Sequence, residues 1–76
     1  MDKNELQLIS AYTRIRTMHN EAGSIICDLS YIKKAFEKQN KKEQALDIET
    51  INENIRKAYF ALDDAINDIE DLMTES

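Results

Sequence analysis

Apolar residues recur at alternating spacings of three and four along two long stretches of this chain. The first stretch contains Leu8, Ala11, Ile15, Met18, Ala22, Ile25, Leu29, Ile32 and Phe36, and the second contains Ile48, Ile51, Ile55, Ala58, Leu62, Ala65, Ile69 and Leu72. This period is typical of amphipathic helices. The pattern therefore predicts one helix over about residues 3–39 and a second helix over about residues 46–74. Asn40 with Glu43 resembles a capping box, which offers an earlier start of the second helix near Lys41. Gly23-Ser24 is the one place where the first helix could break, but the apolar residues stay in phase across it and favour a continuous helix.

The two apolar stripes are related by a mirror about position 42. Phe36 then faces Ile48 at one end, and Ala22 faces Leu62 further along. A small residue opposite a large one keeps the distance between two helices constant. The twelve positions between the stripes would put them about 120° apart on one straight helix. We therefore expect an all-α fold, an antiparallel helical hairpin with its turn at about residues 40–45.

A second, partly apolar band flanks the predicted contact between the helices. It contains Tyr12, His19, Ile26 and Lys33 from the first helix and Asn52, Tyr59, Ile66 and Met73 from the second, whereas the opposite flank is polar. A second apolar side is typical of four-helix bundles, and a lone two-helix hairpin cannot surround its own core. We therefore expect a homodimer that forms an antiparallel four-helix bundle. Its expected interface comprises Tyr12, His19, Gly23, Ile26, Tyr59, Ile66 and Met73.

Composition narrows the class of protein further. The 76 residues include one Gly, no Pro and one Cys, and the formal net charge is -5. This composition favours long helices in a single domain over residues 1–76. The lone Cys27 excludes an internal disulfide, and the N-terminal residues lack the apolar segment of an export signal, so we expect a cytoplasmic protein. The apolar runs are too short to predict a membrane span, and the Ile, Asn and Lys bias fits an AT-rich bacterial or phage genome.

The sequence shows no pattern of a catalytic or metal site. His19 is the only histidine, and no carboxylate stands three residues before it as in di-iron bundles. Cys27 lacks the basic neighbours that activate a nucleophilic thiol. The Asp68-x-x-Asp71 pair resembles the carboxylates of all-α nucleotide pyrophosphatases, but the matching Glu-x-x-Glu on a preceding helix is absent. We therefore expect a protein that is not an enzyme and that binds no cofactor or metal.

Acidic residues crowd the end of the second predicted helix. Negative charge in a final turn opposes the helix macrodipole, so helix stability does not explain the cluster. It is interpreted either as a solvated face or as a docking surface for a basic partner. We expect a small interaction or regulatory protein, encoded by a phage or mobile element, that binds another protein. The residues expected to bind that partner are Asp63, Asp64, Asp68, Asp71 and Glu75.

Lysines near the predicted turn suggest an alternative function. Lys33, Lys34, Lys38, Lys41 and Lys42 gather there, among Glu37, Glu43, Asp47 and Glu49. The predicted architecture resembles that of Rop, a small plasmid-encoded hairpin whose dimer is a four-helix bundle that binds RNA. The resemblance is one of fold class, and it implies nucleic-acid binding through these lysines as the alternative to a protein partner. The nearly neutral charge of this segment favours the protein partner, because phosphate binding needs an excess of cations.

Overall fold

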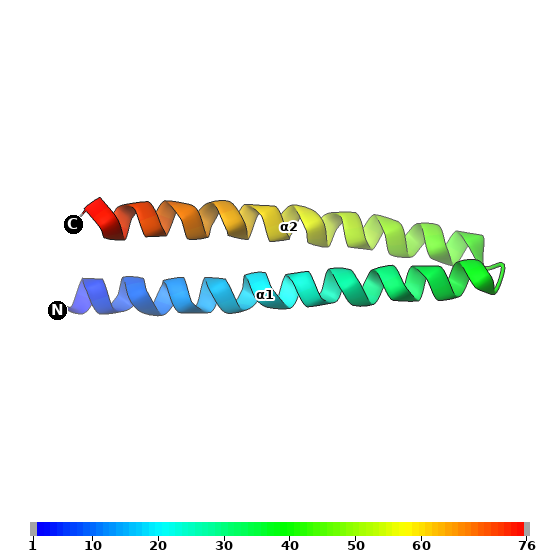
Figure 1. The fold of residues 1–76 in the computed structure, drawn as a ribbon, viewed down its shortest axis with the longest axis horizontal. Coiled ribbons are helices and arrows are strands. Elements are labelled where there is room, and N and C mark those ends of the chain that lie inside the picture. Colours follow the sequence, from blue (N-terminus) through cyan, green and yellow to red (C-terminus); the bar gives the residue numbers. More distant parts are fainter. Residues whose placement is uncertain (1, 76) are drawn as a thin grey trace.

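Two long helices lie side by side along the whole molecule. The computed structural model describes residues 2–75, with helix α1 over Lys3–Lys38 and helix α2 over Lys42–Glu75. The helices are antiparallel, so both ends of the described chain lie at one end of the molecule and the turn lies at the other (Figure 1). The hairpin is 57 Å long and only 14 × 13 Å across. The predicted all-α helical hairpin is confirmed.

Helix α1 is continuous over 36 residues. Asp2 caps its N-terminus, because the Asp2 Oδ1 atom accepts a hydrogen bond of 2.8 Å from the backbone N–H of Glu5. The helix passes Gly23 without a break. A Cβ atom at that position would lie 3.3 Å from Cε2 of Tyr59. The missing side chain therefore admits the Tyr59 ring from α2 close to the α1 backbone.

The turn between the helices is shorter than residues 40–45. Asn40 has a φ angle of 59°, in the left-handed region that asparagine adopts more readily than most residues. The backbone N–H of Lys41 then donates to the carbonyl of Phe36 at 2.9 Å, which satisfies one of the last carbonyls of α1. Only residues 39–41 lie between the helices. Helix α2 therefore begins at Lys42, close to the start near Lys41 that Asn40 and Glu43 indicate and earlier than residue 46.

The surface that each helix turns toward the other differs from the predicted stripe. We call this contact the seam. Its residues are all buried or half-buried, and they are Leu8, Tyr12, Ile15, His19, Ala22, Ile26, Leu29, Lys33 and Phe36 of α1 with Ala45, Ile48, Asn52, Ile55, Tyr59, Leu62, Ile66, Ile69 and Met73 of α2. Half of the predicted stripe belongs to the seam. The other half does not, since the side chains of Met18 and Ile25 are 55% and 43% exposed.

The cross-helix contacts also correct the predicted mirror about position 42. The hydroxyl of Tyr12 donates to Glu70, and the ammonium group of Lys33 donates to Glu49. Both pairs are mirrored about position 41. Relative to the prediction, each helix is rotated by about 50°, half of the 100° between consecutive residues. The predicted facing of alternate rungs, such as Met18 with Ala65, is therefore wrong.

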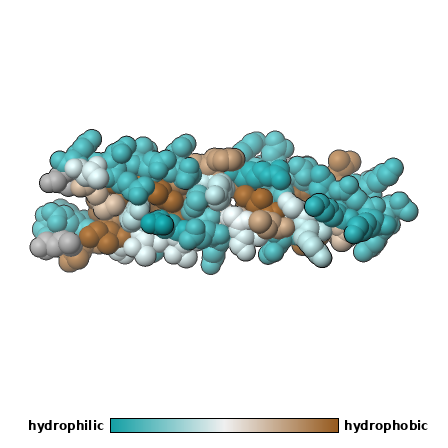
Figure 2. Space-filling view, in the orientation of Figure 1, coloured by the Kyte–Doolittle hydropathy of each residue, from teal (hydrophilic) through white to brown (hydrophobic). Residues whose placement is uncertain are grey.

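The fully buried part of the hairpin is small. Among the described residues, three apolar side chains, Ala22, Ala45 and Ile66, are buried together with the polar Asn52. Figure 2 shows one face of the molecule, where hydrophilic residues cover most of the outer sides of both helices and separate hydrophobic patches follow the line between them. A single hairpin thus buries little apolar surface, because each helix has only one neighbour.

Candidate functional site

The residues expected to form a dimer interface lie instead against the other helix of the same chain. Ile66 is buried, with 9% of its surface exposed. The other six are half-buried, and they are Tyr12, His19, Gly23, Ile26, Tyr59 and Met73. The expectation that this flank forms an exposed band is therefore wrong. It fails because the same residues complete the seam once the helices are rotated.

An aromatic stack fills the middle of the seam. The rings of His19 and Tyr59 are 4.1 Å apart between centroids with 23° between their planes, and Phe60 lies edge-on to Tyr59 at 5.5 Å. The Nε2 atom of His19 is buried and makes no hydrogen bond, and it lies 3.6 Å from Oδ1 of Asp63. His19 is therefore a packed residue of the seam. Asp63 faces it and so stands apart from the outward acidic residues.

Polar pairs line one side of the seam, which we call the polar edge. Nζ of Lys33 lies 2.9 Å from Oε2 of Glu49, and the other Glu49 oxygen accepts from Arg56 at 3.3 Å. The hydrogen bond from Lys33, with its positive charge, lowers the pKa of Glu49, and the same hydrogen bond raises the pKa of Lys33. Further along, Tyr12 donates to Glu70 at 3.0 Å. The polar edge is thus joined by side chains from both helices.

Among residues 2–75, Asn52 is the most deeply buried side chain, with 1% of its surface exposed. Its Nδ2 atom lies 3.2 Å from the hydroxyl of Ser30 and 3.4 Å from the carbonyl of Ile26, while its Oδ1 atom has no hydrogen-bond partner. Sequence reasoning did not identify it as a buried residue. The available signal was its register, because Asn52 is seven residues before Tyr59 and fourteen before Ile66.

The other side of the seam is entirely apolar, and we call it the apolar edge. Its members each precede a seam residue by one position, which places them about 100° around the helix on the same side of the hairpin. Their five large side chains are between 41% and 55% exposed. Large apolar side chains that are about half exposed thus follow one another along the hairpin on this side. The apolar edge comprises Ala11, Met18, Ile25 and Ile32 of α1 with Ile51, Ala58, Ala65 and Leu72 of α2.

The expected partner-binding residues divide between two faces of α2. Asp63 turns toward His19 in the seam. The other four follow one another at spacings of four, three and four, are exposed, and form what we call the acidic stripe: Asp64, Asp68, Asp71 and Glu75. The segment from Asp63 to the end of the chain contains no lysine or arginine. Negative charge is therefore concentrated on one outer face at the open end of the hairpin.

The lysines near the turn do not form one free cationic surface. Lys33 is paired with Glu49 on the polar edge. The ammonium group of Lys41 lies 5.8 Å from the centre of the Phe36 ring. The remaining three are exposed: Lys34, Lys38 and Lys42. The structure thus distributes the positive charge of this segment over several faces.

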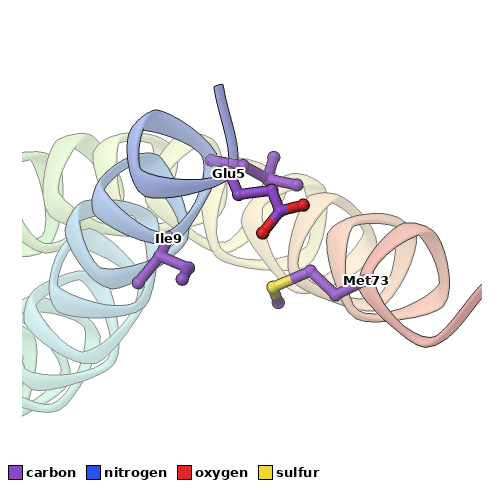
Figure 3. A pocket seen from close by; sticks show the side chains of 4 residues that line it. Glu5, Ile9 and Met73 are labelled. Atoms are coloured by element: carbon purple, nitrogen blue, oxygen red, sulfur yellow. The ribbon is translucent and has the colours of Figure 1, made fainter. Parts of the chain in front are cut away.

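At the open end of the hairpin, Glu5, Leu8 and Ile9 of α1 and Met73 of α2 line a shallow hollow (Figure 3).

Within residues 2–75, no three His, Cys, Asp or Glu side chains gather as a metal ion would require. Neither helix, over the same residues, is long and apolar enough to cross a membrane. Comparison with protein-family models, curated proteins and solved structures finds no match to this chain.

Proposed function

We propose that this chain is a small protein-interaction module that binds a basic protein surface through the acidic stripe. One observation carries the proposal, which is the concentration of uncompensated carboxylates on α2. The last turn of this helix contains no basic residue, although cations there would favour the helix macrodipole. Lysine or arginine side chains of a partner would neutralise these carboxylates, and the relief of the unfavourable charge arrangement would favour binding.

The electrostatics support a protein partner over a nucleic acid. The chain has a net charge of -5, so the molecule as a whole repels phosphate groups at long range. Lys33 forms an ion pair with Glu49, so the positive charge of one lysine that the nucleic-acid alternative requires is already neutralised. A basic protein surface is attracted instead, and its association is steered by the same negative charge.

The proposal is tested by capturing proteins from the native host with the immobilised chain, followed by affinity measurements with the purified partner. Changing Asp64, Asp68 and Asp71 to Asn should weaken binding by roughly tenfold or more, because several charge contacts are lost together. Affinity of the native chain should also fall as salt rises, since exposed charges are screened within about 10 Å at 0.1 M.

A matched control separates this surface from net charge alone. Changing Glu43 and Glu53 to Gln and Asp47 to Asn removes three negative charges from the other end of α2, where all three side chains are exposed. This control should leave the affinity nearly unchanged. Capture of RNA or DNA in place of a protein, or equal losses from both triple variants, would contradict the proposal.

A further inference from the structure

We propose that the apolar edge is covered by a second copy of this chain, which packs with its turn at the same end as the first and with its α2 against α1. This inference goes beyond the binding of a basic partner and concerns a different face of the molecule. The acidic stripe lies on the outer side of α2, and its Asp68 also borders the apolar edge, which lies beside the seam.

The size of the surface fits a second hairpin. The face that contains the apolar edge measures 57 × 14 Å, or about 800 Å² in projection. The projected area of this face is thus similar in size to the accessible surface, about 800 Å², that each partner buries in a stable protein interface. Because α1 and α2 contribute equally to the apolar edge, a single added helix would cover only the groove between them. Two helices of the same length cover the whole face, and a second copy supplies them.

The side-chain sizes along the apolar edge determine the direction of the second copy. From the open end to the turn, α1 presents Ala11, Met18, Ile25 and Ile32, while α2 presents Leu72, Ala65, Ala58 and Ile51 at the same levels. With both turns at one end, α1 of one copy packs on α2 of the other, and a small residue meets a large one at three of these four levels. Interfaces pack densely when small and large residues alternate in this way.

The opposite direction packs poorly. If the turns lay at opposite ends, each helix would lie on its own equivalent and the order of the levels would be reversed. Met18 would then meet Ile25 of the second copy, while Ala65 would meet Ala58 and leave a gap. Large residues forced together are as unfavourable as an unfilled space.

The charged residues beside the apolar edge favour the same direction of the second copy. Arg14, Glu21, Asp28 and Ala35 follow this side of α1, and Asp68, Ala61, Asn54 and Asp47 follow α2 at the same levels. With the turns at one end, Arg14 meets Asp68 of the second copy, and no two like charges are directly opposed. With the turns at opposite ends, Glu21 would meet Asp28 and Asp47 would meet Asp68. Like charges across an interface disfavour association, so this second, independent pattern supports the same arrangement.

The resulting assembly is a four-helix bundle in which every adjacent pair of helices is antiparallel. The exposed large side chains of the apolar edge become its inner contacts, which provides the core that one hairpin lacks. Both acidic stripes then lie at the same end of the bundle, one on each α2. A basic partner would meet two acidic stripes at that end.

Sedimentation equilibrium of the native chain tests the second copy directly. We expect a folded species of twice the 8.8 kDa chain mass. Ile25→Glu should shift this species toward the monomer, or toward loss of helix that depends on protein concentration, because the glutamate would be buried in the interface. The control variants Tyr31→Glu and Phe60→Glu replace side chains that are more exposed and lie off the apolar edge, so the dimer should persist. A native chain that is folded and monomeric, and leaves this edge to some other protein, would overturn the proposal.

The direction of the second copy is tested by the distance between two spin labels. Lys38 is exposed in the last turn of α1, so Lys38→Cys in a Cys27→Ser background provides one label per chain near the turn. Turns at one end should give a separation of about 20–35 Å, the width of a four-helix bundle with its labels. A separation near the 57 Å length of the hairpin would overturn the arrangement even if the chain is a dimer.

Discussion

The Nδ2 atom of Asn52 in α2 lies 3.2 Å from the hydroxyl of Ser30 in α1, at the least exposed position of the hairpin. The same amide also reaches the carbonyl of Ile26 at 3.4 Å. A buried polar side chain with partners on the facing helix fixes how two helices align, because any other register leaves it unpaired. Asn52 is therefore a residue that holds the observed seam against the rotated one that the apolar pattern alone predicts.

Asn52→Asp should destabilise the hairpin at neutral pH. The carboxylate has nearly the same shape but cannot donate to Ser30 or Ile26, and it places an unpaired charge in the seam. We expect a loss of about 2–4 kcal/mol in the free energy of unfolding. Thermal and urea unfolding followed by circular dichroism provide the measurement. Asn54→Asp makes the same chemical change at an exposed position two residues away, and the loss there should be small; equal losses would show that Asn52 does not lie in the seam.

Gly23→Val should force the Tyr59 ring away from α1. A Cβ atom alone would already lie 3.3 Å from this ring, and the two methyl groups of valine need more room. The cost of such overpacking is about 1–3 kcal/mol. Ser24→Val places the same side chain at the next and exposed position without this contact, and since Ser and Val have similar helix propensities it should cost less than about 0.5 kcal/mol. Melting temperatures of the two variants make the comparison, and a Gly23 variant as stable as the Ser24 variant would exclude the close approach of Tyr59.

The ion pair on the polar edge predicts a specific pH dependence. The hydrogen bond from Lys33 lowers the pKa of Glu49 from its ordinary value of 4.5. The ionised Glu49 carboxylate therefore contributes to stability above pH 4.5, and this contribution is lost as the pH falls through the lowered pKa. For Lys33, whose pKa is raised from 10.5, the contribution is present below that pH and is lost as the pH rises through the raised pKa.

Glu49→Gln isolates this contribution. The native chain should melt at a higher temperature than the variant at neutral pH, and the two melting temperatures should converge as the pH is lowered below 4.5. Glu53→Gln removes the same charge from an exposed position and serves as the control. A difference between native chain and Glu49→Gln that stays constant from neutral to acid pH would contradict the role given to this pair.

The sequence was sufficient to predict the two helices and their antiparallel hairpin, because apolar residues at alternating spacings of three and four indicate helices and exclude strands. It was not sufficient to predict which stripe forms the seam. Ile15, Ala22 and Leu29 belong both to the predicted stripe and to the observed seam. The two surfaces differ in whether Met18 or His19 lies beside these residues in the contact between the helices. Hydrophobicity favours Met18. The structure uses His19, since its ring stacks on Tyr59 and leaves the more apolar residue on the edge.

The candidate interaction surfaces could also be predicted only in part from the sequence. The outward direction of Asp64, Asp68 and Asp71 follows from their spacing, so the acidic stripe could be read from the sequence. The position of Asp63 could not, because it depends on the rotation of α2 that brings it to His19. The apolar edge was also visible as a stripe, but it was assigned to the contact between the two helices of one chain.

If one hairpin buries the seam by itself and a second copy covers the apolar edge, thiols placed on the two surfaces should differ in how their reactivity depends on protein concentration. The most direct measurement is the alkylation rate of single thiols at low and high protein concentration, in a Cys27→Ser background. Ile26→Cys in the seam should be protected at every concentration, and Tyr31→Cys on the outer face should react freely throughout. Ile25→Cys on the apolar edge should react in dilute solution and become protected as the concentration rises. A thiol at position 25 that reacts as fast as the one at position 31 at all concentrations would contradict the account.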